Sequence, residues 1–328
     1  MKIVHCKEHG PPRSLVVESV ADPTCDAWSV RVAVRAAGIN FPDLLIIQGK
    51  YQFQPPLPFA PGGEVAGVVT EVGSEVQSFR VGDRVIAIPG WNGFAEQVVV
   101  PEAVCLPIPA EMDFDTAASF AMTYGTSYYA LVQRAHLQRG ETLLVLGASG
   151  GVGSAAVDIG RALGARVIAA GSNPDKLALV RTHYGIHDVL VTGDGRPLKD
   201  SVGALTGGEG ADVIYDPVGG ELFEQALRAV AWNGRILVIG FTSGTIPSAK
   251  ANLLLLKGSS VIGVFWGAFT RREPAVNAAN FAQLFAWYRE GRLAPYISHR
   301  FPLEDAAAAL ETLERREVVG KAVLQVAG

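Results

Sequence analysis

The sequence is poor in cysteine, poor in charge and free of long apolar runs. Its three cysteines, Cys6, Cys25 and Cys105, are too widely spaced for a CxxC site and exclude a disulfide framework. No stretch of about 18 apolar residues without a charge occurs, so we expect no membrane-spanning helix. The first residues contain no apolar segment typical of a secretory signal, so a cytoplasmic protein is expected.

The charge balance argues against a nucleic-acid partner. Charged residues make up 18% of the chain and the formal net charge is −4, whereas a nucleic-acid groove normally requires a basic face. Hydrophobic residues make up 49%, which is far too much for a disordered chain. The length of 328 residues predicts about two domains. Glycine is in excess, at 37 positions, and this predicts many tight turns.

The chain contains two different patterns of predicted secondary structure, one after the other. Up to about residue 120, short β-rich runs are bounded by Gly, Pro or Asp, as in a barrel-like β domain, at 29–36, 64–72, 84–88 and 94–100. From about residue 113, helices alternate with buried strands, which predicts a parallel, doubly wound sheet. The predicted strands there are 143–146, 166–170, 188–191, 212–215 and 235–239, and the predicted helices are 152–163, 174–184 and 221–232. Asn173 and Gly185 are the expected caps of the second helix.

The last part of the chain has a third pattern of predicted strands and helices. We expect a strand at 260–266, helices near 277–290 and 303–314, and a final strand at 321–326. The nucleotide-type segment therefore looks inserted into a domain made from both ends of the chain. We expect one domain from residues 1–122 and 263–328, and a second from 123–262. An apolar strand at a sheet edge needs protection, so the run at 260–266 predicts a homodimer.

The strongest functional motif is a glycine-rich turn between a strand and an amphipathic helix. Residues 143–153 read LLVLGASGGVG, with Ala148, Gly150 and Gly153 in the places of the dinucleotide fingerprint. At these places glycine permits close approach to a pyrophosphate and close packing of helix on sheet. A glycine-rich turn without a ligand is the alternative. The residues predicted to bind a dinucleotide here are Ala148, Ser149, Gly150, Gly151, Val152 and Gly153.

The residues after the next strand predict the choice between NADP and NAD. Sheets that bind NAD usually carry an acidic residue about 20 positions beyond the turn, which binds the ribose 2′-hydroxyl. This chain has Ser172 in that place, and Lys176 follows on the first helical turn. Both side chains can donate to a 2′-phosphate, so we expect NADPH. Asp175 lies between them and opposes a phosphate, and a solvated surface role for Lys176 is the alternative.

The whole chain resembles the medium-chain dehydrogenase/reductase superfamily, and within it the zinc-independent NADPH:quinone oxidoreductases. The segments that carry the resemblance are AGINFPD at 37–43, GKY at 49–51, PGGEVAG at 61–67, VGDRV at 81–85, the glycine-rich turn and YDPVG at 215–219. The resemblance implies an α/β fold, with a GroES-like β-rich catalytic domain and a doubly wound Rossmann nucleotide-binding domain. It also implies a dimer that pairs through the strand at 260–266.

The zinc ligands of the family are missing from this sequence. The family's zinc enzymes have a His before the Glu of a Gly-His-Glu motif, whereas Gly63 precedes Glu64 here. A catalytic zinc needs three protein ligands, and the cluster of His5, Cys6 and His9 lies on the first strand and its turn. We therefore expect no metal, a structural Glu64, and hydride transfer to a quinone or conjugated carbonyl that needs no Lewis acid.

The resemblance also implies roles for individual residues. The catalytic candidates are Tyr51, Asn40 and Asp43, of which Tyr51 would donate to a developing oxyanion. Besides the turn, Ser172 and Lys176, the expected cofactor-binding residues are Asn40, Thr126, Ile239, Gly240, Phe241, Val264, Phe265 and Trp266. The expected lining of the acceptor pocket is Tyr51, Trp91, Phe241 and Trp266. For each of these aromatic residues, a place in the packed interior is the alternative.

Two other functions stay open beside an NADPH-dependent quinone oxidoreductase. An enoyl-thioester or alkenal reductase has the same fold and cofactor and would use basic residues near its site, such as Arg271 and Arg272. A non-catalytic NADPH-binding protein would keep the glycine-rich turn without turnover. The presence of Asn40, Tyr51 and the fingerprint favours an enzyme.

Overall fold

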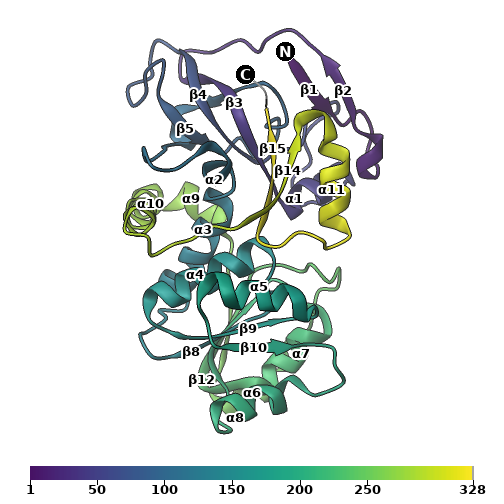
Figure 1. Ribbon diagram of the computed structural model, residues 1–328, viewed down its shortest axis with the longest axis vertical. Coiled ribbons are helices and arrows are strands. Elements are labelled where there is room, and N and C mark those ends of the chain that lie inside the picture. The colour runs from purple at the N-terminus through teal and green to yellow at the C-terminus, as the bar shows by residue number, and fades with distance from the viewer. Residues whose placement is uncertain (327–328) are drawn as a thin grey trace. The chain divides into compact units, whose positions relative to one another are not determined.

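The computed structural model describes residues 1–326, and its internal contacts divide the chain into two compact units. We call Met1–Met122 together with the segment from Tyr296 onward the terminal unit, and Thr123–Pro295 the central unit. In Figure 1 the two parts of the terminal unit are coloured purple to blue and yellow. A continuous central segment thus interrupts a unit made from two distant parts of the chain.

The second boundary differs from the expected division. The sequence pattern groups residues 263–295 with the terminal unit, whereas the contacts group them with the central unit. This segment forms α9 (Trp266–Arg272) and α10 (Pro274–Arg289). The ring of Phe269 stacks on the ring of Tyr129, with centroids 4.0 Å apart, and this contact ties α9 to the central unit.

The terminal unit contains a seven-stranded sheet in the order β14-β15-β3-β4-β5-β7, with β6 paired to β3. Its strands are β3 (Ser29–Ile39), β4 (Glu64–Val72), β5 (Arg84–Ala87), β6 (Gln97–Pro101), β7 (Cys105–Pro107), β14 (Ile297–Pro302) and β15 (Lys321–Gln325), beside a hairpin of β1 (Lys2–His5) and β2 (Val16–Ser19). Alternate residues Val30, Val32 and Val34 of β3 are buried, which fits a strand with one face on the core. The late strands β14 and β15, in yellow, complete the sheet that β3 begins (Figure 1).

The helices of the terminal unit are short. They are α1 (Phe41–Ile47), α2 (Phe114–Ala118) and α11 (Ala306–Glu314), with 3-10 turns at Pro12–Ser14, Glu102–Val104 and Leu303–Asp305. The helix expected at 303–314 is therefore α-helical only from Ala306. The strand expected at 94–100 begins at Gln97, because the backbone of Phe94 bonds to Pro61 and Val4 rather than to β3.

The central unit contains a six-stranded parallel sheet in the order β10-β9-β8-β11-β12-β13. Its strands are β8 (Thr142–Val145), β9 (Arg166–Gly171), β10 (Asp188–Val191), β11 (Ala211–Asp216), β12 (Val230–Val238) and β13 (Ser260–Gly263). Its other helices are α3 (Ala121–Tyr128, which begins in the terminal unit), a π-helical segment Tyr129–Arg134, α4 (Gly151–Leu163), α5 (Pro174–Tyr184), α6 (Leu198–Thr206), α7 (Gly220–Ala229) and α8 (Ala251–Lys257). This order confirms the predicted doubly wound sheet.

Local capping explains α5, whose predicted ends are confirmed. The side chain of Asn173 accepts the backbone N–H groups of Asp175 and Lys176, as an N-cap should. Gly185 ends the helix with φ +62, a conformation that favours glycine. Among residues 1–326, no helix is long and apolar enough to cross a membrane.

Two predicted elements end earlier than expected. The helix expected at 221–232 ends at Ala229, because the chain enters β12 at Val230, which pairs with Ala211. The strand expected at 260–266 ends at Gly263, and Trp266 begins α9 instead. At the first junction, between Ala229 and Val230, there is no Gly or Pro to signal the change of element. At the second junction Gly263 ends the strand, and the expected strand ran past this signal.

Candidate active site

The glycine-rich turn joins β8 to α4 in the central unit. Gly147 has φ +58, in the left-handed region that favours glycine. A Cβ on Gly153 would lie 2.2 Å from the carbonyl oxygen of Gly147, so no side chain fits there. A Cβ on Gly150 would lie 3.4 Å from the same oxygen, which is an acceptable contact. The fold therefore requires glycine at Gly147 and Gly153 but not at Gly150.

The first turn of α4 presents backbone donors. Its N-cap, Gly150, has no side chain to accept them, and Ser154 N donates to Gly150 O at 2.8 Å. The N–H groups of Gly151, Val152 and Gly153 precede this bond and have no acceptor within the helix. The positive end of the helix dipole lies here as well, so the turn fits the pyrophosphate of a dinucleotide.

The two residues predicted to bind the 2′-phosphate of NADPH, Ser172 and Lys176, lie beyond the carboxyl end of β9. Ser172 is exposed directly after this strand, and β9 is the neighbour of β8 in the sheet. Lys176 is half-buried on the first turn of α5. Because parallel strands end at one edge of a sheet, both residues lie at the same edge as the glycine-rich turn. Asp175 is exposed on the same turn of α5, and its N–H is held by the cap Asn173.

The other predicted cofactor residues follow β12 and β13 or lie on α3. Two backbone bonds continue the sheet beyond these strands: Ile239 N donates to Asp216 O at 2.9 Å, and Val264 N donates to Val238 O at 3.0 Å. Thr126 is half-buried on α3. Gly240, Phe241 and Phe265 follow on the same strand ends. Their backbone therefore lies at the carboxyl edge of the sheet, where doubly wound folds bind nucleotides.

Trp266 is packed among the helices of the central unit, and its expected role in the cofactor and acceptor site stays a prediction. Its side chain is 7% exposed, and its ring meets the ring of Phe281 edge-on at 6.3 Å. A Cβ on Gly125 would lie 2.7 Å from the Trp266 ring, so the indole lies directly against the backbone of α3. Its Nε1 donates to Asn277 Oδ1 at 3.3 Å. The ring thus packs α3, α9 and α10 together.

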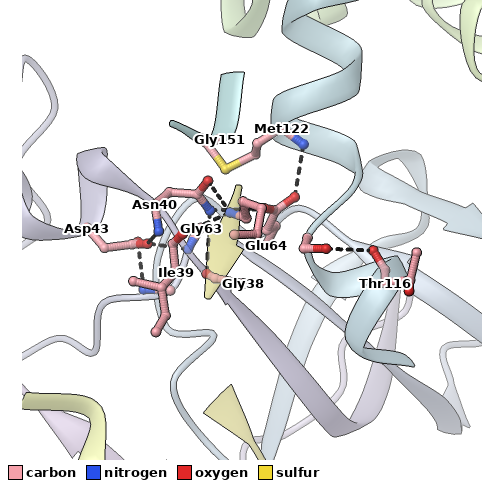
Figure 2. Close-up of polar contacts among 12 residues, drawn as sticks. Gly38, Ile39, Asn40, Asp43, Gly63, Glu64, Thr116, Met122 and Gly151 are labelled. Carbon is pink, nitrogen blue, oxygen red and sulfur yellow. Dashed lines mark hydrogen bonds and ion pairs between the residues drawn. The ribbon is translucent and has the colours of Figure 1, made fainter. Parts of the chain in front are cut away.

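Three buried polar side chains meet in the terminal unit, and we call Asn40, Glu64 and Lys321 the buried triad. Asn40 Nδ2 donates to Glu64 Oε1 at 3.0 Å (Figure 2). Lys321 Nζ donates to Glu64 Oε1 at 3.1 Å and to Asn40 Oδ1 at 2.6 Å. The other carboxylate oxygen, Glu64 Oε2, accepts the N–H of Met122 in the first turn of α3 (Figure 2).

Lys321 was missed by the sequence reasoning. The available signal is a lysine at the start of an otherwise mostly apolar run, KAVLQV at 321–326, directly after Gly320. A lysine is rarely buried unless it is paired, so a lysine in a core strand points to a partner carboxylate. The sequence does not say which carboxylate, because Glu64 lies far away along the chain.

Asp43 supports the backbone around Asn40. Its Oδ2 accepts the N–H of Asn40 at 2.8 Å, and its Oδ1 accepts the N–H of Gly63 at 3.1 Å (Figure 2). The same Oδ1 also accepts the N–H of Gly62 at 3.0 Å. Burial raises the pKa of this carboxyl to about 6, against the lowering effect of the backbone N–H groups and of the Lys321 charge. Asp43 therefore fixes the start of α1 and the turn before Glu64.

Tyr51 and Trp91 differ in their surroundings. Tyr51 is half-buried, and its ring meets that of Phe53 edge-on at 6.3 Å. Burial, and secondly the charge of Asp43, raise the pKa of the Tyr51 hydroxyl, so it stays protonated at neutral pH. Trp91 is exposed between β5 and β6, so the packed-interior alternative does not apply to it.

The residues considered for a metal do not converge. His5 bonds to Glu18, whereas the ring of His9 lies against that of Phe59. Cys6 donates its thiol proton to the backbone of Glu8. Within residues 1–326, no group of three or more His, Cys, Asp or Glu side chains is placed to hold a metal ion.

Comparisons with known proteins agree with this architecture. Residues 26–110 match the model of the alcohol dehydrogenase GroES-like domain, and residues 151–282 match that of a zinc-binding dehydrogenase. The chain is 41% identical over 327 residues to a quinone oxidoreductase-like protein 2 homolog of Nematostella vectensis, covering 98% of this chain and 88% of that protein. The fold is thus the expected GroES-like domain with a Rossmann-type domain.

Two solved structures are similar over their whole length. A mycobacterial protein in complex with NADPH is 30% identical, with a TM-score of 0.92 and coverage of 99% of this chain and 100% of that chain. A quinone oxidoreductase of Pseudomonas syringae is 30% identical, with a TM-score of 0.91 and coverage of 99% of both chains.

Proposed function

Since the chain belongs to the quinone oxidoreductase-like proteins of the medium-chain dehydrogenase/reductase superfamily, we propose that it is an NADPH-dependent quinone oxidoreductase. The observation that carries the proposal is the glycine-rich turn. Gly150 is not required by the packing of the turn. A glycine at this place of the fingerprint supports the proposal, because it would let a pyrophosphate approach the backbone. The relative of Nematostella vectensis is described as quinone oxidoreductase-like, and the structural relative of Pseudomonas syringae as a quinone oxidoreductase, which supports the choice of acceptor.

NADPH is favoured over NADH by the end of β9. Ser172 is exposed where NAD-binding sheets carry an acidic residue, so no carboxylate at the strand end repels a 2′-phosphate. Lys176 adds a positive charge on the next turn. The mycobacterial structural relative was solved with NADPH, which supports the same choice.

We propose that the reaction uses no zinc, although the matching family model is described as zinc-binding. Zinc needs three protein ligands, usually Cys, His or a carboxylate. In the terminal unit Gly63 precedes Glu64, and both oxygens of Glu64 already accept bonds from protein donors. The residues present therefore do not fit a catalytic zinc.

Without a metal, the protein contributes by positioning the cofactor and the acceptor and by stabilising the charge that develops on the acceptor. When bound, NADPH supplies the hydride. Asn40 and Tyr51 belong to the segments expected to face the nicotinamide and the acceptor, and Asp43 fixes the backbone of Asn40. Because the pKa of Tyr51 is raised, its hydroxyl remains a donor for the oxyanion that develops on the acceptor. A reduced quinone takes its remaining proton from water, so no dedicated base is needed.

We also propose a homodimer that forms through β13. This strand is the edge of the central sheet, and its outer backbone groups have no partner strand in the described chain. Leu255 and Leu256, on the helix just before it, are 81% and 70% exposed. Large exposed apolar side chains next to an unpaired edge are typical of a protein–protein contact.

The deciding experiment is oxidation of NADPH and NADH against a panel of quinones, unsaturated aldehydes and enoyl-CoA thioesters. NADPH-dependent turnover with quinones is expected. Preference for enones or thioesters would move the function to the reductases of conjugated carbonyls, in which case Arg271 and Arg272 are the first residues to replace. Tight NADPH binding without any turnover would show a non-catalytic protein.

A further inference from the structure

Lys321 places a full positive charge in the interior of the terminal unit. The residue is 6% exposed, and its ammonium group donates to Ile39 O at 2.8 Å, to Asn40 Oδ1 and to Glu64 Oε1. A lysine has three N–H donors, so every donor of this group has an acceptor. The ammonium group is therefore held in one place rather than mobile.

The backbone at Lys321 is fixed from two sides. Gly320 has φ +63, and a Cβ there would lie 2.2 Å from Tyr296 O, so this position requires glycine. Lys321 N donates to Tyr296 O at 2.9 Å, and Ala322 pairs with Ile39 on β3. The side chain of Lys321 thus starts from a defined point beside the start of α1.

The orientation of the Asn40 amide depends on this ammonium group. Asn40 Oδ1 accepts from Lys321, whereas Nδ2 donates to Glu64 Oε1 and, at 3.4 Å, to Gly38 O. Lys321 thus donates to the oxygen of the Asn40 amide, and Glu64 accepts from its nitrogen. A flipped amide would set its NH₂ against the ammonium group and its oxygen against the carboxylate.

We propose that Lys321 is a positioning residue of the hydride-transfer site: its ammonium group orients the Asn40 amide and forms an ion pair with Glu64. The inference rests on the proposed function, in which Asn40 faces the nicotinamide. It also accounts for a buried Glu64 without a metal, since a side chain of the same protein supplies the positive charge. Lys321 acts through Asn40 and touches neither cofactor nor acceptor in this role.

The test compares Lys321→Met with the double variant Lys321→Met/Glu64→Gln. The single variant leaves a buried carboxylate without its cation and should lose both stability and turnover. The double variant removes that charge as well, so its melting temperature should recover most of the loss. Its kcat should stay about 100-fold below that of the wild type, because the Asn40 amide is no longer held in one orientation. The KM for NADPH should change little, since the glycine-rich turn is untouched.

A second readout does not depend on turnover. Hydrogen exchange of the Asn40 side-chain NH₂, followed by NMR on protein labelled with ¹⁵N-asparagine, should be at least about tenfold faster in the double variant. Lys257→Met is the matched control, because Lys257 also donates to backbone carbonyls, those of Arg228 and Val230, in the central unit. It should lower stability without lowering kcat.

The outcomes are distinct. Full recovery of both stability and kcat in the double variant would show that Lys321 only balances charge, and would overturn the positioning role. Unchanged exchange of the Asn40 amide would overturn it equally. A wild type that oxidises no NADPH with any acceptor would refute the proposed function, and the exchange of the Asn40 amide would still decide whether Lys321 orients it.

Discussion

Gly153 approaches the carbonyl oxygen of Gly147 so closely that a Cβ would lie 2.2 Å from it, whereas a Cβ on Gly150 would lie 3.4 Å from the same oxygen. The two fingerprint glycines therefore have different roles: Gly153 is required by packing, and Gly150 leaves room for a ligand to approach the backbone. Gly153 allows α4 to pack closely against the turn that follows β8, and Gly150 has no side chain at the N-terminus of α4.

Replacing Gly153 should therefore lower stability, whereas replacing Gly150 should weaken cofactor binding. Gly153→Ala should lower the free energy of unfolding by about 3 kcal/mol or more, because the backbone must move to admit the methyl group. Gly150→Ala should keep the melting temperature within a few degrees but weaken NADPH binding at least about tenfold. Thermal unfolding and titration of NADPH fluorescence measure the two effects. Tight NADPH binding by a stable Gly150→Ala variant would show that no pyrophosphate lies there.

Lys176→Ala should discriminate between the two dinucleotides. The KM for NADPH should rise about tenfold, because a charge-assisted bond to the 2′-phosphate is lost. The KM for NADH should hardly change, since NADH has no 2′-phosphate. Lys199→Ala, an exposed lysine on α6, is the control and should alter neither value. Equal effects of Lys176→Ala on both cofactors would show that Lys176 does not read the phosphate.

Asp43 should give stability a specific pH dependence. The pKa of the Asp43 carboxyl is about 6 in the folded chain, whereas an unperturbed aspartate, as in the unfolded chain, has a pKa of 3.8. The folded state therefore binds this proton more tightly than the unfolded state. Its contribution to stability is therefore full below about pH 4 and falls by about 3 kcal/mol as pH rises to 6. Denaturant unfolding of the wild type and of Asp43→Asn isolates this effect as the difference between the two curves. A difference that is flat from pH 4 to 6 would contradict it.

Association should depend on the apolar residues before β13. Sedimentation of the wild type should give the mass of a dimer at micromolar concentration. Leu255→Glu/Leu256→Glu should shift the mass toward the monomer, because two charges would be buried in the contact. Leu179→Glu replaces a half-exposed leucine on α5 and should leave the mass unchanged. A monomer mass for the wild type at every concentration would rule out the dimer.

Local signals predicted the central unit well. The caps Asn173 and Gly185 fix α5 through contacts within a few residues, and the glycine-rich turn is fixed by contacts between neighbours along the chain. Helix α7 was predicted too long because Ala229 and Val230 change element without a turn residue, and only the pairing of Val230 with Ala211 places the boundary.

Features set by distant residues could not be predicted in the same way. The burial of Trp266 depends on Gly125 and Phe281, which belong to two other helices. Lys321 bonds to side chains 281 and 257 positions away, Asn40 and Glu64, so no window of sequence shows the buried triad. Asn40 was identified from a family resemblance, but the groups that hold its amide required the structure.

The late position of β15 also sets an order of assembly during synthesis. The central unit is one continuous segment and has all its strands once Pro295 has left the ribosome. The sheet of the terminal unit must wait for β14 and β15, and until Lys321 emerges Glu64 and Asn40 lack their cation. Because domains generally fold as units during synthesis, the nucleotide-binding half matures first, and the residues expected to face the nicotinamide are set in place last.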